Sequence, residues 1–139
     1  ELGAAVHLDP TAEDFFEAAL EANEGRGADV VIEAAGKPAA MAGALKLAGF
    51  RARLVNIGID VGGTAEAELG LIQSKELQIR GTIGSPGVWP QTLRFLDRTG
   101  TDLSRLVTSR LPLEQAVEGV RRAHSDRSQV KVHLTSAAS

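Results

Sequence analysis

Cysteine is absent from the 139 residues of the chain. The sequence therefore holds no disulfide, no thiolate zinc site and no cysteine nucleophile. Long apolar runs are absent too, since none approaches the ~20 residues that a membrane-spanning helix needs. The net charge is −3, so the basic excess that is typical of nucleic-acid-binding surfaces is missing as well. We expect neither a nucleic acid nor a membrane as a partner.

What is present is the composition of an ordinary globular domain. Apolar residues make up 43% of the chain and charged residues 24%, and the length fits one domain. The residues from Glu1 to Ala4 contain no initiator methionine, basic region or signal-peptide core. We therefore expect a cytoplasmic protein, and a first residue that lies inside a longer chain.

Short apolar strands are predicted in the first part of the sequence. They are expected at residues 5–8, 29–33, 53–58 and 77–83. Three consecutive β-branched residues, from Val30 to Ile32, indicate that the second of these strands is buried on both faces. The last strand alternates polar and apolar residues, which places it near a sheet edge.

Amphipathic helices are predicted between these strands. Thr11 and Asp14 have the spacing of a capping box, so the first helix is expected to begin directly after Thr11. Pro38 suits the first position of the second helix, because its missing N–H has no partner there, and Gly49 ends that helix. A short helix is expected at 69–74. Strands and helices in this order imply parallel strands with right-handed crossovers, and therefore an open α/β sheet.

The elements become shorter after residue 85. The sequence predicts helices from Pro90 to Gly100 and from Pro112 onward, and strands at 106–111 and 130–134. Both helices begin at a proline, which is common at the first helical position.

Small residues stand where three of the predicted strands end. These positions are Ala34, Ala35 and Gly36, then Ile57, Gly58 and Ile59, then Thr82, Ile83 and Gly84. Ligands of open α/β sheets lie at the carboxyl ends of the strands, and glycine lets the backbone approach a flat ligand closely. Glycine after a strand is also ordinary turn chemistry, which is a sufficient explanation for any one of these positions. Three of them on successive strands favour a shared ligand groove.

Several motifs, in the right order, resemble the medium-chain alcohol dehydrogenases, in particular the zinc-dependent polyol and threonine dehydrogenase branch. The matching segments are 2–10, 25–36, 75–81, 106–114 and 130–132. The resemblance implies a Rossmann-like doubly wound parallel sheet. That sheet would be incomplete, because its first two strands and the Gly-rich G-x-G-x-x-G turn are not in these residues. Residues 1–84 would belong to the dinucleotide-binding domain. Residues 85–139 would fold back toward a catalytic domain and would expose apolar faces without it.

The resemblance also implies a nicotinamide cofactor, NAD or NADP. It assigns the adenosine side to Ala34, Ala35, Gly36 and Lys37, the nicotinamide carboxamide to Ile57, Gly58, Ile59, Thr82, Ile83 and Gly84, and the phosphates to Lys131. The family often has Arg at this last position, and Lys keeps the charge but loses the bidentate geometry. Without the resemblance, Lys131 would be interpreted as a solvated residue on the polar face of the last strand.

The family's zinc ligands lie in an N-terminal domain that these residues do not include. His7, His124 and His133 have no metal-ligand spacing, so we expect zinc in the parent enzyme only and no catalytic residue in this chain. The implied reaction is hydride transfer between an alcohol, secondary or polyol, and NAD(P). A homodimer or homotetramer through the strand near Leu77 to Ile83 is implied as well.

The chain by itself is expected to be inactive and to bind cofactor weakly or not at all, because the phosphate-binding turn is missing. We also expect it to associate, since the strand at 5–8 has no neighbour and the strand at 29–33 has an open edge. Two alternatives remain. One is a zinc-free quinone or enone reductase of the same superfamily, and the other is a stand-alone nucleotide-binding or interaction module.

Overall fold

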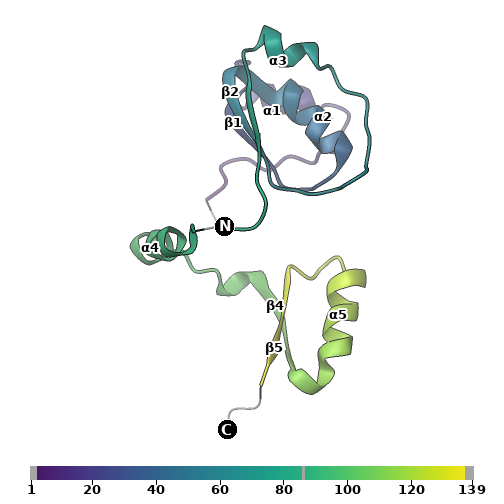
Figure 1. The fold of residues 1–139 in the computed structure, drawn as a ribbon, viewed down its shortest axis with the longest axis vertical. Coiled ribbons are helices and arrows are strands. Elements are labelled where there is room, and N and C mark those ends of the chain that lie inside the picture. The colour runs from purple at the N-terminus through teal and green to yellow at the C-terminus, as the bar shows by residue number, and fades with distance from the viewer. Residues whose placement is uncertain (1–2, 86, 137–139) are drawn as a thin grey trace. The chain divides into compact units, whose positions relative to one another are not determined.

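The structure of the protein, a computed structural model, describes residues 3–85 and 87–136. The chain forms two compact units, Glu1–Ser85 and Pro86–Ser139 (Figure 1). We call them the first unit and the second unit. Within the described residues, no helix has both the length and the apolar character that crossing a membrane requires.

The first unit contains a parallel sheet of three strands. These are β1 (Ala28–Glu33), β2 (Ala48–Asn56) and β3 (Gln78–Gly81), in the order β1-β2-β3. The parallel pairing and the edge position of β3 confirm the sequence-based predictions. With helices between its strands, this is the incomplete Rossmann-like α/β fold that the motifs imply.

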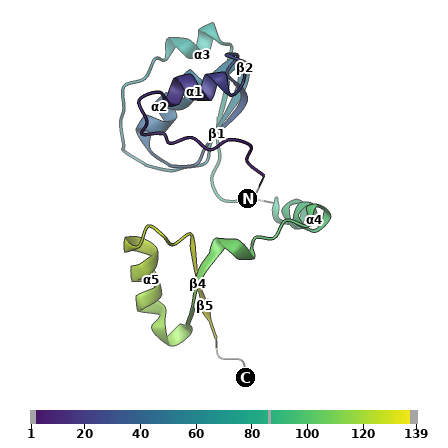
Figure 2. The ribbon, with the colours of Figure 1, turned by 180° about the vertical axis from the view of Figure 1, so that it is seen from behind.

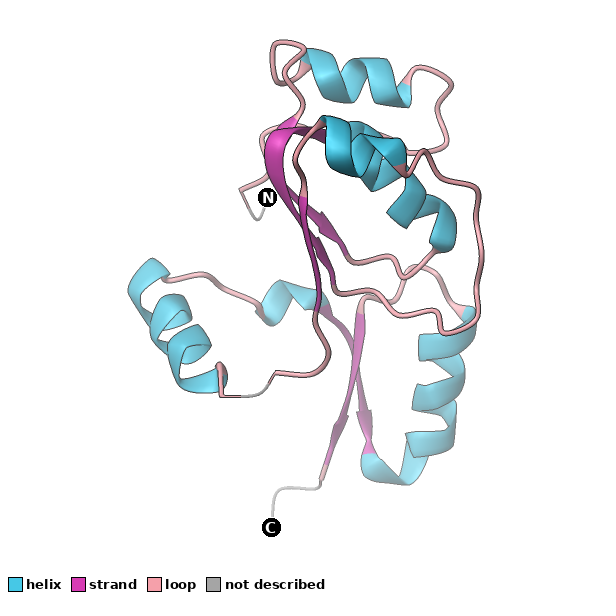
Figure 3. Cartoon of the chain, turned by 45° about the horizontal axis from the view of Figure 1, so that its top comes forward, coloured by secondary structure: helices cyan, strands magenta, loops and turns pink. Residues whose placement is uncertain are grey.

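The helices of the first unit lie on one side of the sheet (Figure 3). They are α1 (Phe15–Glu21), α2 (Pro38–Leu47) and α3 (Gly70–Ser74). Helix α2 contacts β1 and β2, and α1 lies next to α2 (Figure 2). Pro38 occupies the first turn of α2, as predicted.

The core of the first unit forms where α2 meets the sheet. Ala44 and Leu45 of α2 pack against Leu54 of β2, which is only 2% exposed. Burying a leucine side chain this completely stabilises a fold by roughly 1.5–3 kcal/mol. The partly buried side chains that complete the cluster are Val31, Leu71, Ile72 and Leu77.

Lys75 closes the C-terminal end of α2. Its Nζ donates hydrogen bonds to the carbonyl oxygens of Leu45 (3.1 Å), Lys46 (3.0 Å) and Ala48 (2.7 Å). The last carbonyls of a helix have no partner within the helix, and the helix dipole favours a cation there. A residue 27 to 30 positions away therefore holds the end of α2 in place.

Two predictions at the N-terminal side are wrong. Residues 5–8 form no strand, since no neighbouring strand pairs with them. The Thr11 N–H and hydroxyl both donate to Asp9 Oδ1, at 2.8 and 2.7 Å, which forms a turn in place of a capping box. Helix α1 consequently begins at Phe15, after Asp14, whose side chain makes no capping hydrogen bond.

Two predictions, about the burial of β1 and the end of α2, also need correction. β1 is not buried on both faces, because Val30 and Ile32 are 43% and 61% exposed. It is an edge strand that helices cover on one side only, so only Val31 reaches the core. Gly49 does not end α2, which stops at Leu47 and passes directly into β2.

The second unit has a parallel sheet of two strands. Its elements are α4 (Trp89–Thr99), the 3-10 turn Ser104–Leu106, β4 (Val107–Pro112), the 3-10 turn Leu113–Gln115, α5 (Ala116–Ser125) and β5 (Lys131–Thr135). Gly100 ends α4 in a left-handed conformation (φ 61°), as predicted. The helix expected after Pro112 begins with a 3-10 turn and becomes α-helical at Ala116. Gly119 of α5 packs closely on β5, where an added Cβ would lie 3.0 Å from Leu134.

Candidate functional site

The three strands of the first unit end at one level. Glu33, the last residue of β1, is the register partner of Asn56, which ends β2. Asn56 in turn is the partner of Gly81, which ends β3. The loops that begin at Ala34, Ile57 and Thr82 therefore leave the sheet together, so the predicted positions share one edge.

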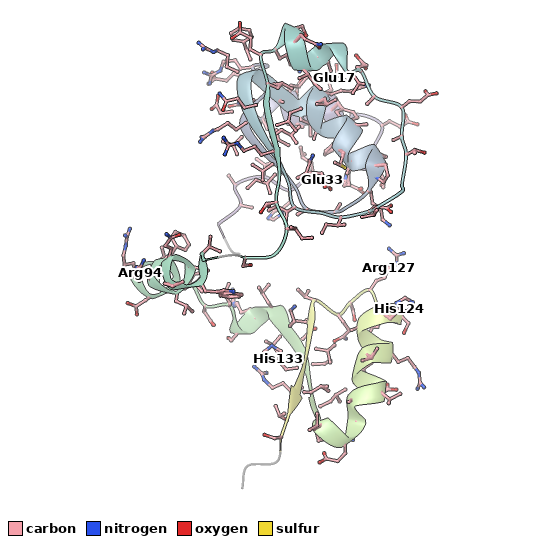
Figure 4. All side chains as sticks on the ribbon, viewed as in Figure 1. Glu17, Glu33, Arg94, His124, Arg127 and His133 are labelled. Carbon is pink, nitrogen blue, oxygen red and sulfur yellow. The ribbon has the colours of Figure 1, made fainter. Side chains whose placement is uncertain are left out.

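The Glu33 side chain organises the loop after β1. The residue is 5% exposed, and Oε1 accepts hydrogen bonds from the N–H groups of Ala35 (2.7 Å) and Gly36 (2.9 Å). Figure 4 shows Glu33 on the side of the sheet where α2 lies. The Glu33 carbonyl oxygen accepts from the N–H groups of Ile57 (2.8 Å) and Gly58 (3.1 Å). One residue thus joins the ends of two strands.

Gly36 and Gly58 bring the first two loops into backbone contact. Gly36 has a left-handed φ of 65°, and a Cβ added there would lie 2.8 Å from the Ile59 nitrogen. A Cβ added to Gly58 would lie 2.0 Å from the Gly36 nitrogen and 2.8 Å from Glu33 Oε2. No side chain fits between the two loops, so both glycines are required by close approach and not only by turn geometry.

The loops after β2 and β3 border a cleft of about 460 Å³. Gly58, Ile59, Thr82 and Ile83 all line it, together with Asn56. The Thr82 N–H donates to the Asn56 carbonyl oxygen at 3.0 Å, which continues the sheet pairing one residue beyond β3. The structure therefore brings four of the predicted site residues together in one cleft.

The other predicted residues of the first unit lie around this edge. Ala34 and Ala35 are exposed and line a separate cavity of about 590 Å³, bordered by α1 and α2. Lys37 is exposed and stands directly before α2. Gly84 has a left-handed φ of 63° and no atom within 4 Å of an added Cβ, so ordinary turn geometry accounts for it.

Lys131 belongs to the second unit. It is the first residue of β5 and is exposed. The structure therefore places it in a different compact unit from the other predicted site residues.

The described residues do not fit a metal site. Among them, no group of three or more His, Cys, Asp or Glu side chains is arranged to hold an ion. His124 lies on α5 and His133 on β5 (Figure 4).

Several carboxylates at surface turns have perturbed acidity for local reasons. Hydrogen bonds from Thr11, Ser104 and Ser128 lower the pKa values of Asp9, Asp102 and Asp126. Each donor lies two residues after its carboxylate, as is typical of Asx turns. These shifts reflect turn structure and point to no chemistry.

Sequence reasoning did not identify Glu33 and Asn56 as site residues. Glu33 follows a run of β-branched residues, and Asn56 interrupts the otherwise apolar segment from Leu54 to Ile57. A polar residue inside a buried strand needs a hydrogen-bond partner, and that requirement was the available signal.

Most of the similar proteins and structures are named dehydrogenases. Scyllo-inosose 3-dehydrogenase of Thermotoga maritima is 31% identical over 140 residues, covering 96% of this chain and 35% of that protein. L-threonine 3-dehydrogenase of Symbiobacterium thermophilum is 38% identical over 120 residues, covering 83% and 34%. The crystal structure of 2R,3R-butanediol dehydrogenase from Bacillus subtilis is 26% identical with a TM-score of 0.78, covering 91% and 37%.

The chain spans about a third of the length of the curated relatives it matches. Residues 1–98 match the family model described as zinc-binding dehydrogenase. This match includes all three strands of the first unit and every predicted site residue except Lys131. The chain belongs to the zinc-binding dehydrogenase family.

Proposed function

We propose that this chain supplies a nicotinamide-cofactor-binding region of an oxidoreductase that transfers a hydride between NAD(P) and a secondary alcohol or polyol. The observation that carries the proposal is the shared edge of β1, β2 and β3, where Gly36 and Gly58 leave room for no side chain. The relatives act, by their names, on an inosose, on threonine and on butanediol. These are small hydroxyl compounds or their oxidised forms.

Backbone groups that are already hydrogen-bonded at the ends of the strands are not available to a cofactor. The N–H groups of Ile57 and Thr82 are engaged by the carbonyl oxygens of Glu33 and Asn56. Ile57 and Thr82 would therefore meet the nicotinamide carboxamide with their carbonyl oxygens, which suit its NH₂ group. The cofactor, when bound, supplies the hydride acceptor or donor, and this chain orients it.

The remaining assignments follow the family. Ala34, Ala35, Gly36 and Lys37 would adjoin the adenosine side of the cofactor, Ile57 to Ile59 and Thr82 to Gly84 the carboxamide, and Lys131 the phosphates. Residues 1–84 would belong to the dinucleotide-binding domain, and residues 85–139 would pack toward the catalytic domain. The zinc ligands and the catalytic acid–base groups would come from outside these residues, in a cytoplasmic enzyme.

The free edge of β3 suits pairing with a second copy of the chain. Gln78 to Gly81 are all exposed, and β3 pairs only with β2 in the described sheet. An unpaired strand edge is a template for another strand. We include a homodimer or homotetramer through this strand in the proposal, and light scattering across a concentration series tests it. A constant monomer mass would contradict it.

Titration of the 139-residue chain with NADH and NADPH tests the proposed function. We expect no micromolar binding by calorimetry, because the Gly-rich phosphate-binding turn is not in these residues. At millimolar cofactor, NMR shift changes should concentrate at Ala34–Lys37, Ile57–Ile59 and Thr82–Gly84. Changes centred elsewhere, or none, would overturn the proposal. Micromolar binding would favour a stand-alone nucleotide-binding module.

A further inference from the structure

Among the residues that the structure describes, two buried acceptor atoms at the edge of the first unit have no hydrogen-bond donor. They are Glu33 Oε2 and Asn56 Oδ1. A buried polar atom with no hydrogen bond costs roughly 1–3 kcal/mol, and native proteins contain few of them. Two on neighbouring strands call for a common explanation.

Glu33 and Asn56 are neighbours on the same face of the sheet. They are register partners on the parallel strands β1 and β2, which in a sheet run about 5 Å apart. Two residues earlier, Val31 and Leu54 are also register partners and meet in the core against α2. Side chains alternate along a strand, so Glu33 and Asn56 face α2 as well.

The chemistry of an amide accounts for both acceptors. The oxygen and nitrogen of an asparagine side chain have nearly the same shape, so a half-turn about the Cβ–Cγ bond exchanges them. With the amide turned, Nδ2 occupies the buried position of Oδ1 and faces the carboxylate. It can then donate a hydrogen bond to Glu33 Oε2, while Oε1 keeps its bonds from Ala35 and Gly36.

We propose that Glu33 and Asn56 form a hydrogen-bonded positioning pair, in which Asn56 Nδ2 donates to Glu33 Oε2. The pair fixes the loop after β1 to the end of β2 and so sets the approach of Gly36 to Gly58. This inference deepens the proposed function and rests on it for its biological purpose. The pair itself is a property of the unliganded chain.

Exchange of the two groups tests the pair. Asn56→Asp alone places two carboxylates on register partners and should lower the melting temperature strongly. Glu33→Gln alone sets one amide against another and should lower it less. In the double variant, the amide at position 33 can donate to the carboxylate at position 56 and still accept from Ala35 and Gly36. We expect the second change to recover at least half of the loss caused by the first.

A matched control uses the next strand. Gln78→Glu makes the same amide-to-carboxylate change on β3, at an exposed residue whose register partner is Arg53. Combined with Glu33→Gln, its effect on the melting temperature should be additive. Additive effects in the Glu33–Asn56 cycle as well would overturn the proposal.

Hydrogen exchange separates a local effect from general destabilisation, which would speed exchange throughout the unit. The Asn56 side-chain amide protons should exchange about tenfold more slowly than those of an unbonded amide, as one hydrogen bond implies. Asn56→Leu should speed exchange at the Ala35 and Gly36 N–H groups but not at Leu54. Rapid Asn56 side-chain exchange in the unaltered chain would contradict the proposal even if Asn56→Asp failed to fold. Neither experiment uses cofactor, so a negative cofactor titration would leave this result standing.

Discussion

The two units of this chain have the same arrangement of elements, but they bury very different numbers of apolar side chains. Each has parallel strands with a helix packed beside them. The first unit buries five apolar side chains almost completely: Ala44, Leu45, Ala48, Ala52 and Leu54. In the described residues of the second unit, only Leu111 is comparably buried.

The difference shows how strand number limits a core. A third strand lets α2 and α3 of the first unit close over β2, whose central position hides Leu54. Two strands and one helix enclose few side chains on every side, and such small sheets need further packing to be stable. The apolar residues that remain exposed in the second unit include Trp89, Leu93 and Phe95 of α4 and Val117 and Val120 of α5. Exposed apolar faces were expected there from the resemblance.

Truncating one side chain in each unit tests the comparison most directly. Leu54→Ala should cost about 3 kcal/mol of unfolding free energy, because it leaves a cavity in the core. Val117→Ala, at a side chain that is 76% exposed, should change it by less than about 0.5 kcal/mol. Urea denaturation of both variants gives the two values. Similar losses would show that Val117 is covered in solution.

The glycine contact at the strand ends gives the next largest effect. Gly58→Ala should cost about 2 kcal/mol, since its new methyl group would overlap the Gly36 backbone. Gly81→Ala is the matched control, because it also stands at a strand end and has nothing within 4 Å of an added Cβ. Thermal unfolding of the two variants measures the difference. Equal stability would mean that the first two loops do not touch.

The smallest effect is expected from the ion pairs on α5 of the second unit. A hydrogen bond from Arg122, together with the charges of Arg122 and Arg121, lowers the pKa of Glu118. A carboxylate whose pKa is lowered by folding stabilises the folded state at neutral pH and loses this contribution as the pH falls below about 4. In the Glu118→Gln variant, the melting temperature should therefore fall slightly less steeply as the pH is lowered. High salt should remove the difference between the variant and the unaltered chain, since the pairs are exposed.

Local sequence signals predicted most of the elements but not what stabilises their ends. β1, α2, α3, α4 and β5 lie close to their predicted positions, because β-branched runs, helix-starting prolines and terminal glycines act locally. The prediction of a strand at 5–8 was wrong because a strand forms only when it pairs with a neighbouring strand. The Lys75 cap could not be predicted from local signals, because it joins residues about 30 positions apart. Asn56 could not be predicted as a site residue because its role depends on the residue opposite it on β1.

The Lys75 cap also has a consequence for how the first unit folds. The carbonyl oxygens of Leu45, Lys46 and Ala48 can accept from Lys75 only after the chain has passed through β2 and α3 and returned to residue 75. Helix formation here is therefore coupled to a non-local loop closure, and α2 should mature together with the β2–β3 pairing rather than before it. The kinetics of that single helix end would report on the closure of the whole β2–α3–β3 segment.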